Sequence, residues 1–435
     1  MSESRIAASP AGQFAWALYD WANSAFFAVI GTFIFATYFT QAIAPDPETG
    51  TALWGYALTT SAVIIAIASP LLGAIADAGG RRKPWLFACT LLGVIGSAGL
   101  WTATPDTSAI WHTLVLFALA NVGLEVAAVF YNAMLPDVVP PHRMGRMSGW
   151  AWGMGYAGGM VCLLIALFGF VQVETPPFGL DKASAENVRI IGPMIALWLT
   201  VFSIPLFLLT PDRPSASLPK AVAVRQGVAA LKRTILGVRH YRQALLYLVA
   251  HMLYADGLAT LFAFGGIYAA GTFGMELNEV IIFGIVLNVT AGIGAFAFAW
   301  VDDWFGPKKT IIIALVSLLA CGLAALLVES KAAFWVAGSC LGIFVGPAQA
   351  ASRSLMARLA PADLRAEMFG LYALSGKATA FLGPLLLGTA TLAFASQRAG
   401  MATILAFFAI GLVLLLFVKE PPAEAAKIAD RPITA

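Results

Sequence analysis

Long apolar runs recur along almost the whole chain, and they limit the possible folds more than any other feature. A bilayer core takes about 20 residues of helix at about 1.5 Å per residue. Lipid offers no partner to backbone polar groups, so runs of this length are expected to be helices. Twelve spans are predicted, at residues 13–40, 52–76, 84–104, 109–135, 147–172, 190–209, 243–272, 279–301, 309–328, 332–356, 367–393 and 400–418.

The composition agrees with lipid as the main solvent. Of the 435 residues, 60% are apolar and 11% are charged, and the mean hydropathy is +0.83. A soluble domain carries about 25% charged residues. The net charge of +3 is small and scattered, so no nucleic-acid partner is expected. The first apolar run is too long for the core of a cleavable signal peptide.

The sequence contains nothing typical of a metal site, a cofactor site or an enzyme. Its four cysteines stand singly in apolar runs, without metal-ligand spacing. No nucleophile lies next to a base in a catalytic pattern. We therefore expect no metal, no cofactor and no enzymatic reaction.

The positions of Lys and Arg predict how the spans are oriented. If the N-terminus is inside, the inner segments hold 20 of the 26 basic residues and the outer segments hold four. The other two, Arg353 and Lys377, lie within spans. This bias places both termini in the cytoplasm and predicts a multi-pass protein of the plasma membrane, the inner membrane of a bacterium.

The longest inner connection divides the chain into two six-span bundles. Residues 1–209 form the first bundle, 210–242 a cytoplasmic linker, and 243–435 the second bundle with a short tail. An apolar stripe in the linker predicts an amphipathic helix along the inner membrane face. A solvated linker helix is the alternative. The stripe consists of Val224, Val228, Leu231, Ile235 and Val238.

The two halves repeat each other. The segment 72–83 joins spans two and three, and a similar segment, 298–309, joins spans eight and nine. Their aspartates, Asp77 and Asp303, are 226 residues apart, and Pro140 and Pro361 match at an offset of 221. Repeated six-span halves are typical of transporters that rock about a site near the bilayer midplane.

Five ionisable side chains lie well inside spans, and such residues are usually functional. They are three acids and two bases, Asp20, Glu125, Asp256, Arg353 and Lys377. This near balance favours pairing in a shared cavity, formed by spans 1, 4, 7 and 10, that suits a zwitterionic or anionic molecule. A purely structural network of ion pairs is the alternative.

These charges and the polar residues near them form the predicted solute site. A carboxylate in apolar surroundings favours its neutral form, so Glu125 is the first candidate for proton coupling, with Asp20 or Asp256 contributing. Protons, or Na⁺ instead, are the expected coupling ions. The predicted solute-binding residues are Asp20, Asn23, Asn121, Tyr131, Asn132, Asp256, Gln349, Arg353 and Lys377.

The turn between spans two and three resembles the signature of the major facilitator superfamily. The resemblance implies a twelve-helix all-α fold of two pseudo-symmetric bundles, and a cytoplasmic latch that steadies the outward-open state. In the second copy, Ala299 replaces the first glycine of the motif and Pro307 its first arginine. The implied gate residues are Gly73, Asp77, Gly80, Arg81, Arg82, Lys83, Asp303, Gly306, Lys308 and Lys309.

Further motifs occur at residues 19–24, 130–136, 349–354, 369–372, 376–377 and 383–384. They resemble the vacuolar-effluxer-like branch of that superfamily, also called the "unknown major facilitator" family. The resemblance implies a secondary active transporter, and the branch's fungal members are linked to amino-acid efflux from the vacuole. Sugars, peptides or amphiphilic drugs are alternative solutes, and a non-transporting scaffold or receptor is an alternative function. We expect a monomer in contact with lipid.

Overall fold

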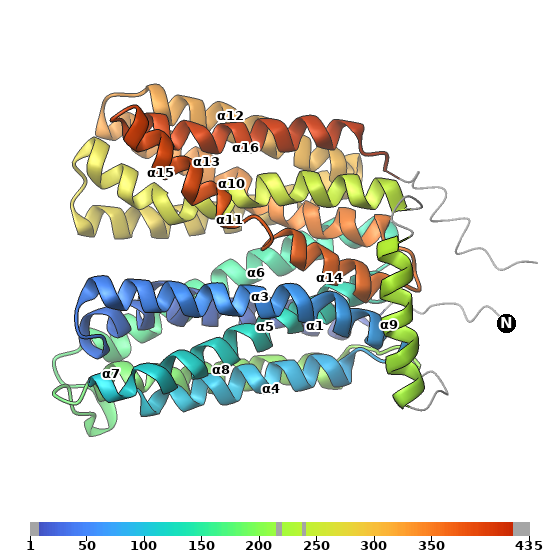
Figure 1. Ribbon diagram of the computed structural model, residues 1–435, viewed down its shortest axis with the longest axis horizontal. Helices are drawn as coiled ribbons and strands as arrows, with labels where there is room; N and C mark the ends of the chain where they lie inside the picture. The colour runs from blue at the N-terminus through green and yellow to red at the C-terminus, as the bar shows by residue number, and fades with distance from the viewer. Residues whose placement is uncertain (1–7, 215–219, 237–240, 421–435) are drawn as a thin grey trace, which may run out of the picture.

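The computed structural model describes residues 8–214, 220–236 and 241–420, and their regular elements are all helices (Figure 1). The first half forms one bundle. Its helices are α1 (Pro10–Ala25), α2 (Phe35–Tyr38), α3 (Pro47–Gly79), α4 (Lys83–Gly99), α5 (Ile110–Val138), α6 (Met144–Ala166), α7 (Glu186–Arg189) and α8 (Ile191–Leu209). Wider π-type turns carry the first span through α2 to Ile43.

The second half forms the other bundle, and the linker helix α9 (Lys220–Leu236) lies between the two along the chain. The remaining helices are α10 (Arg242–Phe273), α11 (Leu277–Phe305), α12 (Pro307–Leu327), α13 (Lys331–Leu359), α14 (Arg365–Ser375), α15 (Leu382–Ala393) and α16 (Gln397–Phe417).

Eleven helical segments of the described chain are long and apolar enough to cross a membrane, and the remaining predicted span, the eleventh, is broken. The prediction of one continuous helix over 367–393 is wrong, because residues 376–381 form a turn between α14 and α15. Here the amides of Lys377 and Ala378 both donate to the carbonyl of Leu374, which ends the regular ladder. Pro384 has no amide proton, so it fits the first turn of α15 but not the interior of a longer helix.

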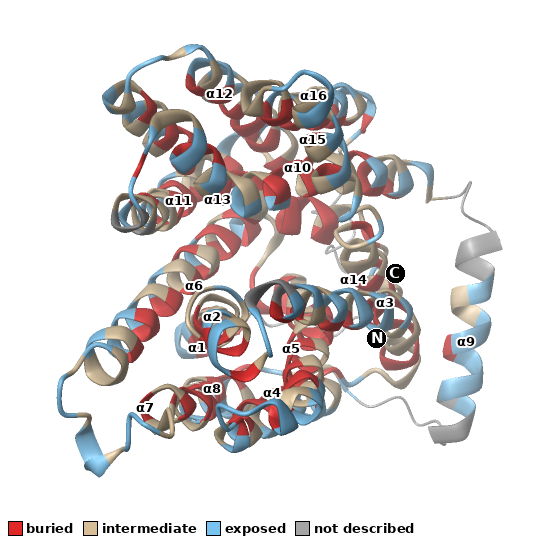
Figure 2. Cartoon of the chain, turned by 60° about the vertical axis from the view of Figure 1, so that its left-hand side comes forward, coloured by how far each residue is buried: buried red, intermediate tan, exposed pale blue. Residues whose placement is uncertain are grey.

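Burial follows the bundle arrangement (Figure 2). One apolar core runs through both halves and a second lies within the first half, while large apolar side chains cover the outer surface. Examples are Phe87, Trp111, Leu197 and Val336, which are 54–71% exposed. A surface of this kind suits lipid rather than water, so the chain is a multi-pass membrane protein.

The two halves meet mainly through two pairs of helices. α6 packs against α11, and α3 packs against α14. Glycines permit this approach, because a Cβ on Gly73 would collide with the carbonyl of Ala366, and one on Gly370 would lie 2.5 Å from the carbonyl of Ser69. We call the end of the bundle that carries α9 the linker end and the opposite end the far end. The halves are joined at the linker end and separate toward the far end (Figures 1 and 2).

The linker helix α9 lies across the linker end and packs on α3 (Figure 1). The backbone of α3 at Ala74 and Ile75 approaches Gly227, where a Cβ would lie 2.7 Å from the Cα of Ile75. Val224 and Val228 of the predicted stripe are exposed, while Val238 lies outside the described residues. A helix is therefore present where the pattern predicted one, and its place on a membrane surface stays a prediction.

Candidate functional site

An ion pair between Asp20 of α1 and Arg353 of α13 joins the two halves within the membrane. Nη1 of Arg353 donates to Oδ2 of Asp20 at 2.8 Å and to Oδ1 of Asn132 at 3.3 Å. Asn132 and Arg353 correspond to each other in the repeat, 221 residues apart. Residues that correspond in two related halves meet only near the axis that relates the halves, so this pair lies close to that axis.

The guanidinium of Arg353 is also held by Ser148 of α6. Its Nε donates to the Ser148 hydroxyl at 2.8 Å and its Nη2 to the Ser148 carbonyl at 2.7 Å. Aromatic rings cover its faces, since Trp16, Tyr131 and Trp152 have centroids 5.1–5.7 Å from its central carbon. Only 3% of the side chain is exposed. This charge is saturated with partners and closed to solvent.

A second pair, between Glu125 of α5 and Lys377, also joins the halves. Nζ of Lys377 donates to Oε1 of Glu125 at 2.7 Å. Lys377 lies in the turn that separates α14 from α15, in the middle of the broken span. The two side chains are 33% and 23% exposed, which makes this pair far more accessible than the first.

The other residues predicted for solute binding take varied positions. Gln349 accepts a hydrogen bond from Tyr156 of the opposite half at 2.5 Å, and Tyr131 stacks on Trp16 at 4.3 Å between ring centroids. Asn23 is half-buried, and its Oδ1 has no partner among the described residues. The structure thus brings most of the predicted residues together along the interface between the halves.

Asn121 and Asp256 stand apart from the two ion pairs. Asn121 is 7% exposed on α5, one turn from Glu125. Asp256 is 2% exposed, and its carboxylate accepts the amide of Gly383 at 3.2 Å, within the second half. Of the spans predicted to line the solute site, span 7 therefore adds no charge to the pairs that cross the interface, and span 11 adds Lys377 instead.

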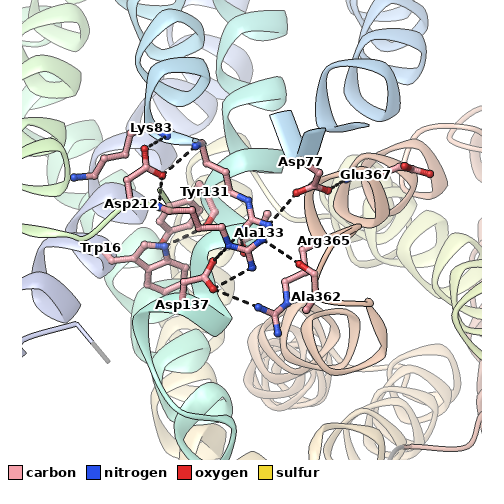
Figure 3. Close-up of polar contacts among 12 residues, drawn as sticks. Trp16, Asp77, Lys83, Tyr131, Ala133, Asp137, Asp212, Ala362, Arg365 and Glu367 are labelled. Carbon is pink, nitrogen blue, oxygen red and sulfur yellow. Dashed lines mark hydrogen bonds and ion pairs between the residues drawn. The ribbon is translucent and has the colours of Figure 1, made fainter. Parts of the chain in front are cut away.

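Charged residues close the linker end (Figure 3). Arg82 is fully buried and donates to Asp77, to Asp137 and to the carbonyl of Ala133 at 2.6–3.0 Å. The other oxygen of Asp77 accepts the amide of Glu367 at 2.9 Å, in the first turn of α14. A carboxylate at a helix N-terminus is favoured by the free amides and the helix dipole. This contact crosses from the first half to the second.

The second copy of the turn makes the same contact in the opposite direction. Asp303, at the end of α11, accepts the amide of Arg146 at 3.0 Å and forms an ion pair with its side chain at 3.1 Å. Arg146 lies in the first turn of α6, as Glu367 does in α14. The two latches are therefore related by the repeat, and both join a carboxylate of one half to a helix start of the other.

The remaining predicted gate residues support these latches within their own halves or lie outside them. Gly80 and Gly306 end α3 and α11 with φ of 82° and 87°, which only glycine adopts easily. Arg81 lies 3.6 Å from Asp212 of the linker, and Lys83 donates to the carbonyl of Phe207 at 2.9 Å. Lys308 donates to the end of α16, at the carbonyl of Leu416.

Several residues of the interface were not singled out from the sequence. The largest group surrounds Asp137, which forms ion pairs with Arg213 and Arg365 at 2.8 and 3.3 Å. Ser148 and Tyr156 complete the contacts of Arg353 and Gln349. One signal was available: the offset of 221 aligns Arg146 with Glu367, which are the two residues that face the latch carboxylates.

Comparison with known proteins assigns a family. The profile described as "Vacuole effluxer Atg22 like" matches residues 48–427. The MFS-type transporter YxiO of Bacillus subtilis (strain 168) is 30% identical over 411 residues, covering 93% of this chain and 94% of that protein. Both matches extend across the two halves and the linker.

Solved structures show the same fold. The proton:xylose symporter XylE superposes with a TM-score of 0.74 at 12% identity, covering 97% of this chain and 98% of the other. FucP, a major facilitator transporter in the outward conformation, gives 0.73 at 16% identity, covering 96% and 100%. The chain therefore has the major facilitator fold, with twelve spans in two pseudo-symmetric bundles.

Proposed function

The chain belongs to the Atg22-like vacuole effluxer family of major facilitator transporters, and we propose that it carries a small zwitterionic solute across the membrane by alternating access. As a member of this family it is a transporter rather than an enzyme. The observation that carries the proposal is the Glu125–Lys377 pair, which joins the halves in mid-membrane and is still partly exposed. An accessible ion pair can exchange its partners for those of a solute.

The two members of this pair suit the two ends of an amino acid. A solute ammonium group would replace Lys377 beside Glu125, and a solute carboxylate would replace Glu125 beside Lys377. The carboxylate side is further favoured because α15 starts five residues after Lys377, and the start of a broken helix attracts anions. The amide and hydroxyl groups of Gln349 and Tyr156 offer further polar contacts at the interface.

The closed linker end supports an outward-facing state. Basic residues gather at this end, which by the positive-inside rule is the cytoplasmic side. Both termini then lie in the cytoplasm of a bacterial cell, and the far end faces outward. FucP, a structural neighbour, was solved in the outward conformation. In the proposed cycle, solute binding closes the far end while the latches at Asp77 and Asp303 release.

Glu125 is the proposed site of proton coupling. Protonation would remove its charge and free Lys377. Breaking of the pair would then depend on both the proton and the solute. Two structural neighbours are described as proton symporters, XylE and FucP. A Glu125→Gln variant should transport solute, if slowly, at a rate that no longer changes with pH. Full pH dependence in this variant would exclude Glu125 as the coupling group.

The solute class can be tested on the purified protein. Amino acids, sugars, peptides and amphiphilic drugs are screened for an increase in melting temperature, because a ligand that binds only the folded state raises it. We expect zwitterionic amino acids to stabilise the protein, and the hits to be transported in proteoliposomes. Stabilisation by sugars or drugs alone would overturn the proposed solute class, and binding without transport would favour a receptor.

A further inference from the structure

Asp256 is a buried carboxylate with one oxygen unused. It lies near the middle of α10, and its Oδ2 accepts the amide of Gly383 at 3.2 Å. Its Oδ1 has no hydrogen-bond partner among the described residues, although only 2% of the residue is exposed. Leaving a carboxylate oxygen unpaired is unfavourable in a membrane interior, so a positively charged partner is expected there.

The hydroxyl of Thr260 shares the space beside this oxygen. Thr260 follows Asp256 by one turn of α10, is 1% exposed, and its Oγ1 also has no partner. Threonines of α15 behave differently, since Thr389 and Thr391 donate to the carbonyl four residues before them. A Cβ on Gly383 would collide with Oγ1 of Thr260 and lie 2.9 Å from Oδ1 of Asp256. The two unpartnered oxygens therefore both lie beside Gly383, where only a residue without a side chain fits.

The same region adjoins the broken span, and α10 holds both sides of the break. On the α14 side, Nδ1 of His251 lies 2.8 Å from the hydroxyl of Ser375, and on the α15 side Asp256 binds Gly383. Within the turn, the carbonyls of Gly376 and Ala378 accept no hydrogen bond from another described residue. In broken membrane helices, unwound carbonyls of this kind coordinate cations.

We propose that Asp256, Thr260 and the turn between α14 and α15 bind a sodium ion within the second half. Asp256 and Thr260 offer a carboxylate oxygen and a hydroxyl oxygen beside Gly383, and the neighbouring turn has free carbonyl oxygens. All three are ligands that hard cations prefer. One negative charge matches a monovalent ion. The amide of Gly383 donates to Oδ2, which leaves Oδ1 as the oxygen that would face the cation.

This inference goes beyond the proposed function because the site lies apart from Glu125 and Lys377. It can bind sodium regardless of which solute the protein carries. It also gives the broken span a role. A cation between α10 and the two halves of the span would hold the turn that carries Lys377. Sodium would then stabilise the position of one member of the exposed ion pair without touching it.

The test is the melting temperature of the purified full chain in a sodium chloride titration, with choline chloride keeping the ionic strength constant. We expect a saturable rise with sodium and none with choline, since binding to the folded state raises stability. Asp256→Asn should abolish the rise. No difference between sodium and choline in the unaltered protein would overturn the proposal, because the carboxyl would then be protonated or solvated instead.

A second set of variants keeps the test independent of how well the aspartate variant folds. Thr260→Val should weaken the apparent sodium affinity by about tenfold or more, and Thr260→Ser should restore it. Thr389→Val is the matched control, because it removes the same group from α15 outside the site. An unchanged titration in Thr260→Val, or equal losses in the two valine variants, would contradict the site. None of these readouts requires transport, so they fail or succeed separately from the solute screen.

Discussion

The two ion pairs that join the halves inside the membrane, Asp20–Arg353 and Glu125–Lys377, differ in their partners and in their exposure. Arg353 is bound by Asp20, Asn132 and Ser148, is covered by aromatic rings, and is 3% exposed. Among the described residues, Glu125 is the one side-chain hydrogen-bond partner of Lys377, whose side chain is 33% exposed. The first pair holds the two halves together near the closed linker end, whereas the second is accessible enough to exchange partners. Accessibility, rather than charge alone, separates a closure contact from a candidate solute site.

Removal of Arg353 should produce the largest effect. Arg353→Met leaves the Asp20 carboxylate buried and unpaired, which should lower stability by about 3–5 kcal/mol and abolish transport. The melting temperature and proteoliposome uptake measure both effects. An Asp20→Asn/Arg353→Met double variant should recover part of the stability, because it removes the stranded charge. A melting temperature unchanged by Arg353→Met would show that the two pairs do not differ as described.

Removal of Lys377 should affect transport and spare the fold. Lys377→Met breaks a partly exposed pair, so the stability change should stay below about 1 kcal/mol. Solute uptake should fall by about 30-fold or more, as expected when a charge that binds the solute is lost. Amino acids should also cease to raise the melting temperature of this variant. A large loss of stability with normal uptake would reverse the assigned roles of the pairs.

Exchanging the charges within each pair should sharpen the comparison. Glu125→Lys/Lys377→Glu should fold almost as well as the unaltered protein, with a coupling energy between the two changes of about 0.5–3 kcal/mol. Asp20→Arg/Arg353→Asp should not recover, because an aspartate at 353 would face the Ser148 carbonyl and lose the aromatic contacts. The melting temperatures of the single and double variants give a double-mutant cycle for each pair. Equal recovery of the melting temperature in the two double variants would contradict the proposed difference between the two ion pairs.

An exposed pair at the far end should give the smallest effect. Lys331 lies 2.8 Å from Glu279, and its hydrogen bond and charge lower the pKa of Glu279 below its ordinary value of 4.5. This contribution to stability is therefore present above about pH 4.5 and is lost as the pH falls through the lowered value. Lys331→Met should leave the melting temperature at neutral pH nearly unchanged. A marked loss there would show that exposure is a poor guide to the importance of a pair.

The sequence predicted the spans well because lipid imposes a length and a polarity on each helix. The predicted span 243–272 is observed as Arg242–Phe273, and 309–328 as Pro307–Leu327. The break in span eleven was missed because its apolar composition continues across 376–381, and hydropathy does not report where backbone hydrogen bonds end. The contacts of His251 and Asp256 with the two ends of the break come from another helix.

Apolar runs and isolated charges determined which residues lie at depth in the membrane, and the repeat determined that two related halves surround them. The tertiary structure alone decided which acid meets which base. Asp20 and Arg353 are 333 residues apart in sequence, and Glu125 and Lys377 are 252 apart. Their meeting depends on close glycine contacts between the halves and on a broken helix. Both are properties of packing between distant segments, and no local pattern in the chain encodes them.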